Sequence, residues 1–181
     1  MTEKQFFDWQ TRGGVHDVQT LVHVLESAQV PWCMIGGLAV NHWAEEPMAT
    51  ADVDLVLATD RIEETVRALI GAGFQSKSFE WSINLMGTSK LSIQISTESI
   101  YQAFPSRSVA TEVHGILMRV ACKEDVLTGK ILAYRDHSRR PSKRTKDLLD
   151  IMRLVEAHIE LMNLLPPEIA QKVAALEDGQ D

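Results

Sequence analysis

The sequence has little of what marks secreted, disulfide-linked or zinc-binding proteins. Its 181 residues include only two cysteines. Cys33 and Cys122 each lie within an apolar run, and neither has a second cysteine or a histidine at the spacing of metal ligands. A disulfide framework and a zinc site are therefore excluded, and we expect both thiols to be buried and reduced.

Long hydrophobic runs are absent too. No stretch approaches the roughly 18 to 20 apolar residues that a membrane-spanning helix needs. The first residues, MTEKQFFDWQTRGG, lack the apolar segment of a signal peptide. We therefore expect a cytoplasmic protein that makes no membrane contact.

Basic residues are outnumbered by acidic ones, 18 to 25, which gives a formal net charge of −7. A chain of this sign does not suit a general nucleic-acid coat protein. One segment, RDHSRRPSKRTK at residues 135–146, has the opposite sign, so any polyanion would have to bind locally. This segment is either a solvated loop and helix start or a contact for RNA or nucleotide phosphate.

The sequence does contain a clear alternation of helical and strand periodicity, and its 45% hydrophobic content is enough for one globular domain with a substantial core. We predict helices over residues 15–28, 38–44, 59–73, 97–104, 123–136 and 142–162, followed by a tail that begins at Pro166. We predict strands over residues 30–35, 52–57, 79–86, 90–96 and 115–121.

This order of elements predicts an α/β (α+β) fold, in which a mixed β-sheet is flanked by helices and followed by a helical C-terminal part. We divide the chain into an α/β core with an N-terminal helix, residues 1–122, and a helical region, residues 123–181, packed on the core as one compact unit. The most regular predicted helix has Asp60 as its N-cap and Glu63 as the capping-box partner.

The stretch MIGGLAVNHWAEEPMATADVDLVL contains two features that suit poorly a purely structural role. Asp52 and Asp54 lie inside an apolar strand pattern, where aspartate is disfavoured. Residues two apart in a strand point to the same face, so the two carboxylates can hold a divalent metal between them. Gly36 and Gly37 let the backbone approach a ligand closely, and the helix after them aims its amides at a phosphate.

These residues resemble the nucleotidyltransferase superfold of the DNA polymerase beta type, in which a strand ending in Gly-Gly or Gly-Ser and a short helix precede a Thr-x-Asp-x-Asp strand. Gly36, Gly37, Thr50, Asp52 and Asp54 match this pattern in order. More narrowly, EDVLTGKILAYRDHSRRPSKRTKDLLDIMRL is similar to the helices of the bacterial AbiE-type toxin nucleotidyltransferases, which carry Lys and then Lys-Asp-x-x-Asp. The resemblance covers about residues 31–154.

The resemblance implies a nucleoside triphosphate substrate, Mg²⁺ or Mn²⁺ as cofactor, and a cognate partner protein. The acceptor stays open between a tRNA end, a protein hydroxyl and a small molecule. The implied roles fall on seven residues: Asp52 and Asp54 as catalytic metal ligands, Lys130 as a catalytic and nucleotide-binding residue, and Gly36, Gly37, Thr50 and Asp147 as nucleotide-binding residues.

The sequence departs from the family pattern at two places. Many members carry a third carboxylate on a later strand as general base, and residues 90–96 place Gln94 there. Glutamine cannot accept a proton at neutral pH, so catalysis is slowed, lost, or served by another acid such as Glu98 or Glu80. An arginine that often precedes the threonine is also missing, with Met48 and Ala49 in its place.

Each candidate also has a structural alternative. The glycines could form a tight turn, and the aspartates could begin a surface strand. Lys130 could flank an apolar face, while Asp147 and Asp150 could stabilise a helix start through its dipole. His42 and Trp43 could stack a base, although partial core packing is the simpler interpretation.

The hypothesis that follows is a nucleotidyltransferase that moves a nucleotidyl group from a nucleoside triphosphate to a hydroxyl acceptor with Mg²⁺. Two alternatives remain open: a catalytically impaired module of the same fold that binds a nucleotide or a partner, and a component of a toxin–antitoxin system. The choice of base, the acceptor and the oligomeric state do not follow from the sequence.

Overall fold

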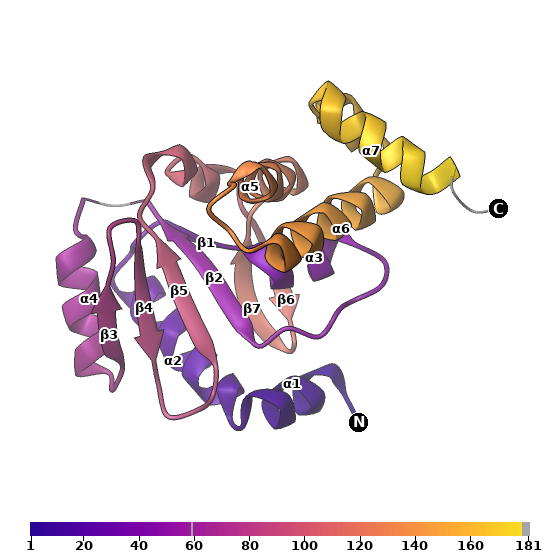
Figure 1. Ribbon diagram of the computed structural model, residues 1–181. Coiled ribbons are helices and arrows are strands. Elements are labelled where there is room, and N and C mark those ends of the chain that lie inside the picture. Colours follow the sequence, from indigo (N-terminus) through magenta and orange to yellow (C-terminus); the bar gives the residue numbers. More distant parts are fainter. Residues whose placement is uncertain (59, 179–181) are drawn as a thin grey trace. The chain divides into compact units, whose positions relative to one another are not determined.

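The computed structural model describes residues 1–58 and 60–178, apart from the side chains of Glu3, Glu177 and Asp178 (Figure 1). It contains one mixed sheet of seven strands in the order β3-β4-β5-β2-β1-β7-β6. The strands are β1 (Trp32–Ile35), β2 (Asp52–Leu57), β3 (Gln75–Ser78), β4 (Ser82–Met86), β5 (Ser92–Ser96), β6 (Val109–Val113) and β7 (Ile116–Val120).

Helices account for most of the remaining chain. The α-helices are α1 (Glu3–Thr11), α2 (Gly14–Ser27), α3 (Gly36–Trp43), α4 (Ile62–Gly71), α5 (Lys123–Arg135), α6 (Pro141–Ala157) and α7 (Pro167–Asp178). Three short 3₁₀ helices are η1 (Ser99–Tyr101), η2 (Phe104–Arg107) and η3 (Ile159–Leu164). The predicted α/β fold, a mixed sheet flanked by helices with a helical C-terminal part, is confirmed.

The chain divides into two compact units. Met1–Ala39 and Met48–Cys122 form one, which we call the sheet unit; Val40–Pro47 and Lys123–Asp181 form the other, which we call the helical unit. None of the described helices is long and apolar enough to cross a membrane.

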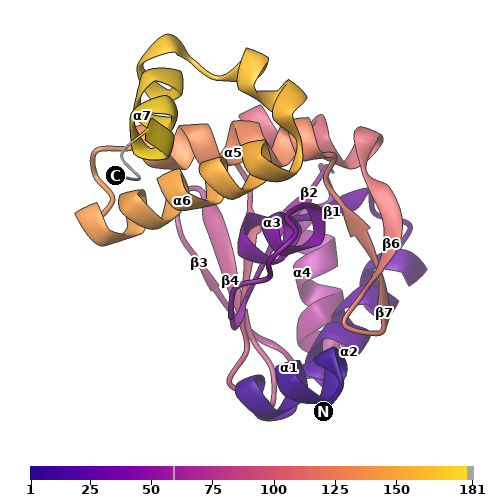
Figure 2. The ribbon, with the colours of Figure 1, turned by 90° about the vertical axis from the view of Figure 1, so that its right-hand side faces the viewer.

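The core of the sheet unit lies between α2 and one face of the sheet. Val18 of α2 and Val53 of β2 line the same small interior space, together with Leu38. Leu21 and Leu25 continue the buried stripe of α2 at the helical spacing that the sequence shows. α2 and α4 contact each other and lie side by side (Figures 1 and 2). The odd-numbered residues of β2 therefore face the core, and its even-numbered residues point to the opposite face of the sheet.

A buried carboxylate fixes the turn between β4 and β5 on α2. Asp17 of α2 accepts hydrogen bonds from the backbone N–H and the hydroxyl of both Thr88 and Ser89. A Cβ on Gly87 would overlap this carboxylate. Burial acts to raise the pKa of Asp17, but the hydrogen bonds from Ser89 and Thr88 outweigh it and hold the pKa below its ordinary value. The charged carboxylate thus ties a loop to a helix about 70 residues away in sequence.

Several predicted elements differ from the observed ones. The edge strands β3 and β6 were not predicted because their residues are almost all exposed, which removes the period-two alternation. α1 was also missed, although a capping box between Thr2 and Gln5 begins it. Residues 97–104 do not form one helix but contribute to η1 and η2. The predicted helix over 142–162 ends at Ala157, where η3 takes over after His158.

The predicted helix caps and thiols also need correction. α4 is present, but its N-cap is Arg61 with no side-chain hydrogen bond, so the predicted capping box of Asp60 and Glu63 does not form. Thr59, which the predicted helix included, lies outside the described residues. Neither Cys33 nor Cys122 takes part in a disulfide, but only Cys33 is buried as predicted, whereas Cys122 is half-buried because it lies just beyond the end of β7.

Candidate functional site

The carboxylates of Asp52 and Asp54 occupy the first half of β2, on the sheet face opposite α2. Along the strand, Asp52 is exposed, Val53 is buried, Asp54 is half-buried and Leu55 is buried. The two aspartates therefore alternate with core residues, as the period-two pattern requires. At the end where β2 begins, this face of the sheet presents two acidic groups about 7 Å apart along the strand.

Gly36 lies against the second of these carboxylates. Ile35, the last residue of β1, is the register partner of Asp54, so the chain passes beside Asp54 just before α3 begins. Gly36 has a φ of +72°, and a Cβ at this position would overlap Oδ2 of Asp54 and lie 2.8 Å from its Cγ. Only glycine meets both requirements, the left-handed backbone and the missing side chain. The site therefore needs Gly36 for a close approach to Asp54.

Thr50 completes the cluster from the segment before β2. Its hydroxyl accepts a hydrogen bond from the backbone N–H of Asp52 at 3.4 Å. A Cβ on Gly37 would lie 3.5 Å from the same hydroxyl oxygen, which is ordinary van der Waals distance. The structure thus brings together all five residues of the predicted glycine and aspartate motif within the sheet unit. α3 begins at Gly36 itself, two residues earlier than predicted.

The strand beside the aspartates carries amide and hydroxyl groups. β5 runs parallel to β2, with Ser92 in register with Asp52 and Gln94 in register with Asp54. The predicted strand over residues 90–96 is present as β5, and its pairing with β2 places Gln94 next to the aspartate strand. Glu98 lies four residues further along the chain, about 13 Å from Gln94 in an extended chain, so it is poorly placed to replace a third carboxylate.

The other acid considered from the sequence is equally distant from the aspartates. β4 is antiparallel to β5 and places Asn84 beside Gln94. Glu80 precedes Asn84 by four residues, again about 13 Å along an extended chain, at the end of the sheet away from Asp52. The described residues contain no group of three or more His, Cys, Asp or Glu that could hold a metal ion. On this face of β2, Asp52 and Asp54 are the two carboxylates that an ion could use.

A pair of carboxylates suits one cation in particular. Mg²⁺ is commonly bound through one or two carboxylates and completes its octahedron with waters and substrate phosphate oxygens. Asp52 and Asp54 supply oxygen donors of this kind, and Gly36, which has no side chain, lets the Asp54 carboxylate lie against the backbone where α3 begins. The residues present therefore fit Mg²⁺, or Mn²⁺, bound jointly with a nucleoside triphosphate.

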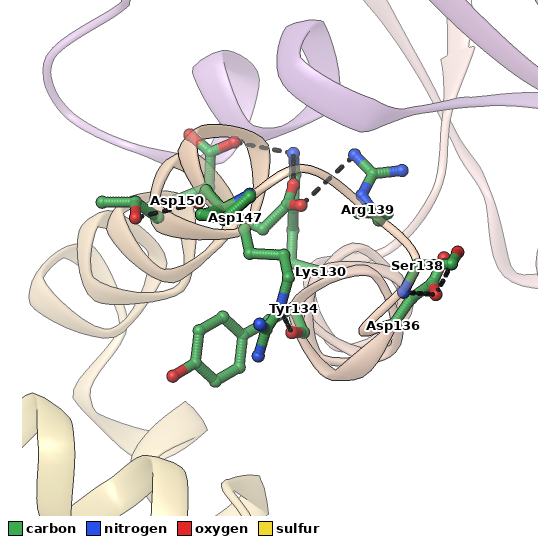
Figure 3. Close-up of polar contacts among 10 residues, drawn as sticks. Lys130, Tyr134, Asp136, Ser138, Arg139, Asp147 and Asp150 are labelled. Carbon is green, nitrogen blue, oxygen red and sulfur yellow. Dashed lines mark hydrogen bonds and ion pairs between the residues drawn. The ribbon is translucent and has the colours of Figure 1, made fainter.

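Lys130 and Asp147 meet in the helical unit. Lys130 of α5 points at two carboxylates of α6, with its Nζ 3.2 Å from Oδ1 of Asp147 and 2.6 Å from Oδ2 of Asp150 (Figure 3). The side chains are 12%, 4% and 0% exposed, respectively. Arg139, in the loop before α6, adds a second cation 3.3 Å from Oδ2 of Asp147. The lysine is already largely neutralised by these partners.

Asp150 was absent from the predicted site, yet it is the most buried member of this cluster. Besides Lys130, it binds Arg153 at 3.0 Å through Oδ1. Arg153 in turn donates hydrogen bonds to Oδ1 of Asn41 and to the carbonyl of Glu46. The i, i+3 spacing of Asp147 and Asp150 was the available sequence signal, because it places both on one face of α6. The cluster joins α5, α6 and residues 40–47.

His42 and Trp43 lie in a partly buried aromatic group of the helical unit. Their ring centroids are 4.7 Å apart in an edge arrangement, and the ring of His158 lies 6.0 Å from that of Trp43. Burial lowers the pKa of His42. Nε2 of His158 also lies 2.9 Å from the carbonyl oxygen of Trp43. These contacts agree with the simpler interpretation, partial core packing.

Three comparisons with known proteins bear on these groups. The family described as the nucleotidyl transferase AbiEii toxin of type IV toxin–antitoxin systems matches residues 19–178. A search of curated proteins found no match.

Several solved structures share the fold. An antigenic nucleotidyltransferase-like protein from Paracoccidioides brasiliensis is 20% identical, with a TM-score of 0.53 over 88% of this chain and 84% of its own. ANT(2")-Ia, solved in complex with adenylyl-2"-tobramycin, is 13% identical, with a TM-score of 0.58 over 91% and 97%. The lincosamide antibiotic adenylyltransferase LnuA, solved with lincomycin, is 12% identical, with a TM-score of 0.50 over 74% and 92%. At these identities the similarity establishes the fold.

Proposed function

Because the chain belongs to the AbiEii family of nucleotidyl transferase toxins, we propose that it transfers a nucleotidyl group from a nucleoside triphosphate to a hydroxyl acceptor in a Mg²⁺-dependent reaction. The observation that carries this proposal is the close contact between Asp54 and Gly36, because it places a carboxylate of the kind that binds Mg²⁺ directly beside the start of α3. Phosphate oxygens fit such a place, since the first amides of a helix lack intrahelical partners and carry its positive dipole end.

In the proposed mechanism, the amides at the start of α3 bind phosphate oxygens of the triphosphate, and Asp52 and Asp54 would hold the divalent ion that offsets the repulsion between their own charge and that of the phosphates. The acceptor oxygen attacks the α-phosphorus in line, a bond forms between them, and the bond from the α-phosphorus to pyrophosphate breaks. The hydroxyl proton passes to solvent, since Gln94 cannot accept it. Mg²⁺ held by Asp52 and Asp54 would neutralise the charge of the phosphate oxygens. The hydroxyl oxygen of Thr50 supports the site by accepting a hydrogen bond from the backbone N–H of Asp52.

Lys130 and Asp147 belong to the proposal as nucleotide-binding residues by their position in the family motif. Their geometry also supports a second role, because together with Asp150 they form a nearly dry ion cluster. A lysine that neutralises two carboxylates has less charge to offer a phosphate than a lysine with no partner. The two roles make different predictions for substitutions at Lys130.

A specific observation favours a second candidate function. Gln94 occupies the position beside Asp54 where a third carboxylate would act, and neither Glu98 nor Glu80 is near it in the sheet register. A module that binds a nucleotide or a partner protein but turns over slowly would retain Asp52 and Asp54 without a general base. This candidate predicts nucleotide binding without pyrophosphate release.

The same proposal, applied to a toxin, predicts an effect on the growth of the cell. A toxin of a type IV system is expected to arrest growth when it is expressed alone, and an antitoxin protein would relieve the arrest. Expression of the wild type should therefore slow growth, whereas Asp52→Asn should not. The acceptor that carries this effect is an RNA end, a protein hydroxyl or a small molecule.

The direct test is pyrophosphate release from each of the four nucleoside triphosphates with Mg²⁺, in the presence of total cellular RNA, total protein or a small-molecule extract. We expect release with one combination and a loss of at least 100-fold in Asp52→Asn, because one of the two metal ligands is weakened. Asp60→Asn, an exposed aspartate outside the cluster, is the matched control. Release that survives in Asp52→Asn would contradict the proposal.

A further inference from the structure

The guanidinium of Arg153, on α6, binds three different groups of the helical unit. Its side chain is only 10% exposed, and one terminal nitrogen lies 3.0 Å from Oδ1 of Asp150 on the same helix. The other terminal nitrogen donates hydrogen bonds to Oδ1 of Asn41, at 2.9 Å, and to the backbone carbonyl of Glu46. Divided contacts of this kind suit the planar fork of an arginine, whereas a lysine offers a single point charge.

Two of these contacts lie at the end of α3. Asn41 is in the last turn of α3, and Glu46 is in the loop over residues 44–51 that follows it. The last carbonyls of a helix have no partner within the helix. The carbonyl oxygen of Trp43 lies 2.9 Å from Nε2 of His158, one residue beyond α6, and since a carbonyl can only accept, that nitrogen donates the proton. The end of α3 is therefore bound by α6 and by the residue that follows α6.

α3 is a helix that needs such contacts. It has eight residues, about two turns, and it begins with Gly36 and Gly37. Helices shorter than about 12 residues are marginal unless tertiary contacts stabilise them, and glycine is a weak helix former. A positive charge near the last turn also interacts favourably with the negative end of the helix dipole. Arg153 supplies both the charge and the hydrogen bonds at this end.

The same arginine shares an ion partner with Lys130. The side chain of Asp150 is fully buried; its Oδ1 binds Arg153, and its Oδ2 lies 2.6 Å from Nζ of Lys130. Arg153 thus connects the end of α3 to a lysine that the family motif assigns to the nucleotide. When Arg153 is replaced by an uncharged residue, Lys130 still neutralises Asp150, so the substitution does not leave a buried carboxylate alone.

We propose that Arg153 is a positioning residue for the nucleotide site. By holding the last turn of α3 and the start of the loop after it, Arg153 keeps α3 helical. The amides at the start of the same helix then keep the directions that phosphate oxygens require. The inference rests on the proposed function, which assigns these amides to the triphosphate. Arg153 itself needs no contact with the nucleotide.

The test combines two measurements on the wild type, Arg153→Met and Arg153→Lys. Amide hydrogen exchange without nucleotide compares residues 40–44, at the end of α3, with residues 127–131 of α5, which report on the rest of the helical unit. The dissociation constant is then measured for non-hydrolysable analogues of the four nucleoside triphosphates with Mg²⁺. The matched control is Arg119→Met, because Arg119 also binds a carboxylate through two nitrogens, that of Glu26 in the sheet unit.

In Arg153→Met, exchange over residues 40–44 should accelerate at least tenfold more than exchange over residues 127–131. The dissociation constant of the analogue that the wild type binds should rise at least tenfold. Arg153→Lys keeps a charge beside Asp150 but not the fork, so it should lie between the wild type and Arg153→Met in both measurements. Arg119→Met should match the wild type in both.

Equal acceleration of the two segments in Arg153→Met would overturn the inference, because the residue would then only stabilise the helical unit. An unchanged dissociation constant in that variant would overturn it too. If Arg153→Met does not fold, Arg153→Lys decides in the same way, and wild-type values in both measurements would refute the inference. Failure of the proposed function is visible separately: the wild type would bind none of the analogues, while the exchange data would still show whether Arg153 holds α3.

Discussion

Gln94 lies directly beside Asp54, as its register partner on the neighbouring parallel strand. Asp54 is one of the two residues that indicate a metal site. Gln94 is the residue at which this site departs most strongly from the family pattern, which has a third carboxylate there. A carboxylate at position 94 would add a third acid to the face that already carries Asp52 and Asp54. The present amide leaves the site with less negative charge and with no group that can take a proton.

Gln94→Glu should make the stability of the protein depend on metal. Without Mg²⁺, the added charge lies about 5 Å from the Asp54 strand and repels the two aspartates, so the melting temperature should fall by a few degrees. With millimolar Mg²⁺ the loss should be recovered. Thermal melts with and without Mg²⁺ measure both effects. The control Gln75→Glu lies on β3, three strands away from β2 and its aspartates, and should show neither effect. A melting temperature of Gln94→Glu that does not change with Mg²⁺ would argue against a metal at Asp52 and Asp54.

Gly36→Ala should remove nucleotide stabilisation and also lower the free energy of unfolding by about 1 to 3 kcal/mol. The substitution combines a left-handed backbone with an overlap on Asp54. Gly115→Ala has nearly the same backbone angle, a φ of +75°, but its Cβ would approach only the flexible side chain of Lys4, at 3.1 Å. The difference between the two variants in urea unfolding isolates the contact with Asp54. Equal losses, with nucleotide binding intact in both, would remove the special role of Gly36.

Lys130→Met should lower the free energy of unfolding by about 3 kcal/mol, because it leaves two nearly dry carboxylates, Asp147 and Asp150, with less positive charge around them. Lys123→Met breaks the exposed pair with Glu160 and should cost little. Urea unfolding of both variants tests the difference. If the Lys130 variant is destabilised but still gains full stability from nucleotide, Lys130 supports the helical unit alone; if that gain is lost, it also acts in nucleotide binding.

Asp17→Asn should destabilise the protein by about 1 to 2 kcal/mol at pH 7. The folded state holds the pKa of Asp17 below its ordinary value of 3.8, so its stabilising contribution is present above that value and is lost as the pH falls through the folded pKa. The gap between wild type and variant should therefore shrink in urea titrations from pH 7 toward pH 3. Asp60→Asn serves as the control, and a gap that grows on acidification would refute the assignment.

The sequence was sufficient for those parts of the fold in which burial sets the period. α2, β2 and α5 lie close to their predicted bounds, because each has a continuous apolar stripe or run. β3 and β6 were missed since an exposed edge strand keeps no hydrophobic alternation. The predicted capping box of Asp60 does not form because the helix begins one residue later than predicted, at Ile62, with Arg61 as its N-cap. Edges and caps depend on tertiary contacts that local patterns do not contain.

The candidate site likewise contains residues that the sequence could group and residues whose role only the structure reveals. Gly36, Gly37, Thr50, Asp52 and Asp54 are close in sequence, and their pattern was enough to group them. The role of Asp150 depends on its contacts with Lys130 and Arg153. These contacts could not be derived from the spacing of Asp147 and Asp150 alone.

A nucleotide site at Asp54 is the central feature of the proposed function. We would measure the melting temperature of the wild type and of Asp54→Asn with each of the four nucleoside triphosphates and Mg²⁺, because a ligand that binds only the folded state raises its stability. We expect at least one triphosphate at millimolar concentration to raise the melting temperature of the wild type by several degrees, and we expect the variant to lose this rise. Equal stabilisation of both proteins, or stabilisation of neither, would contradict it.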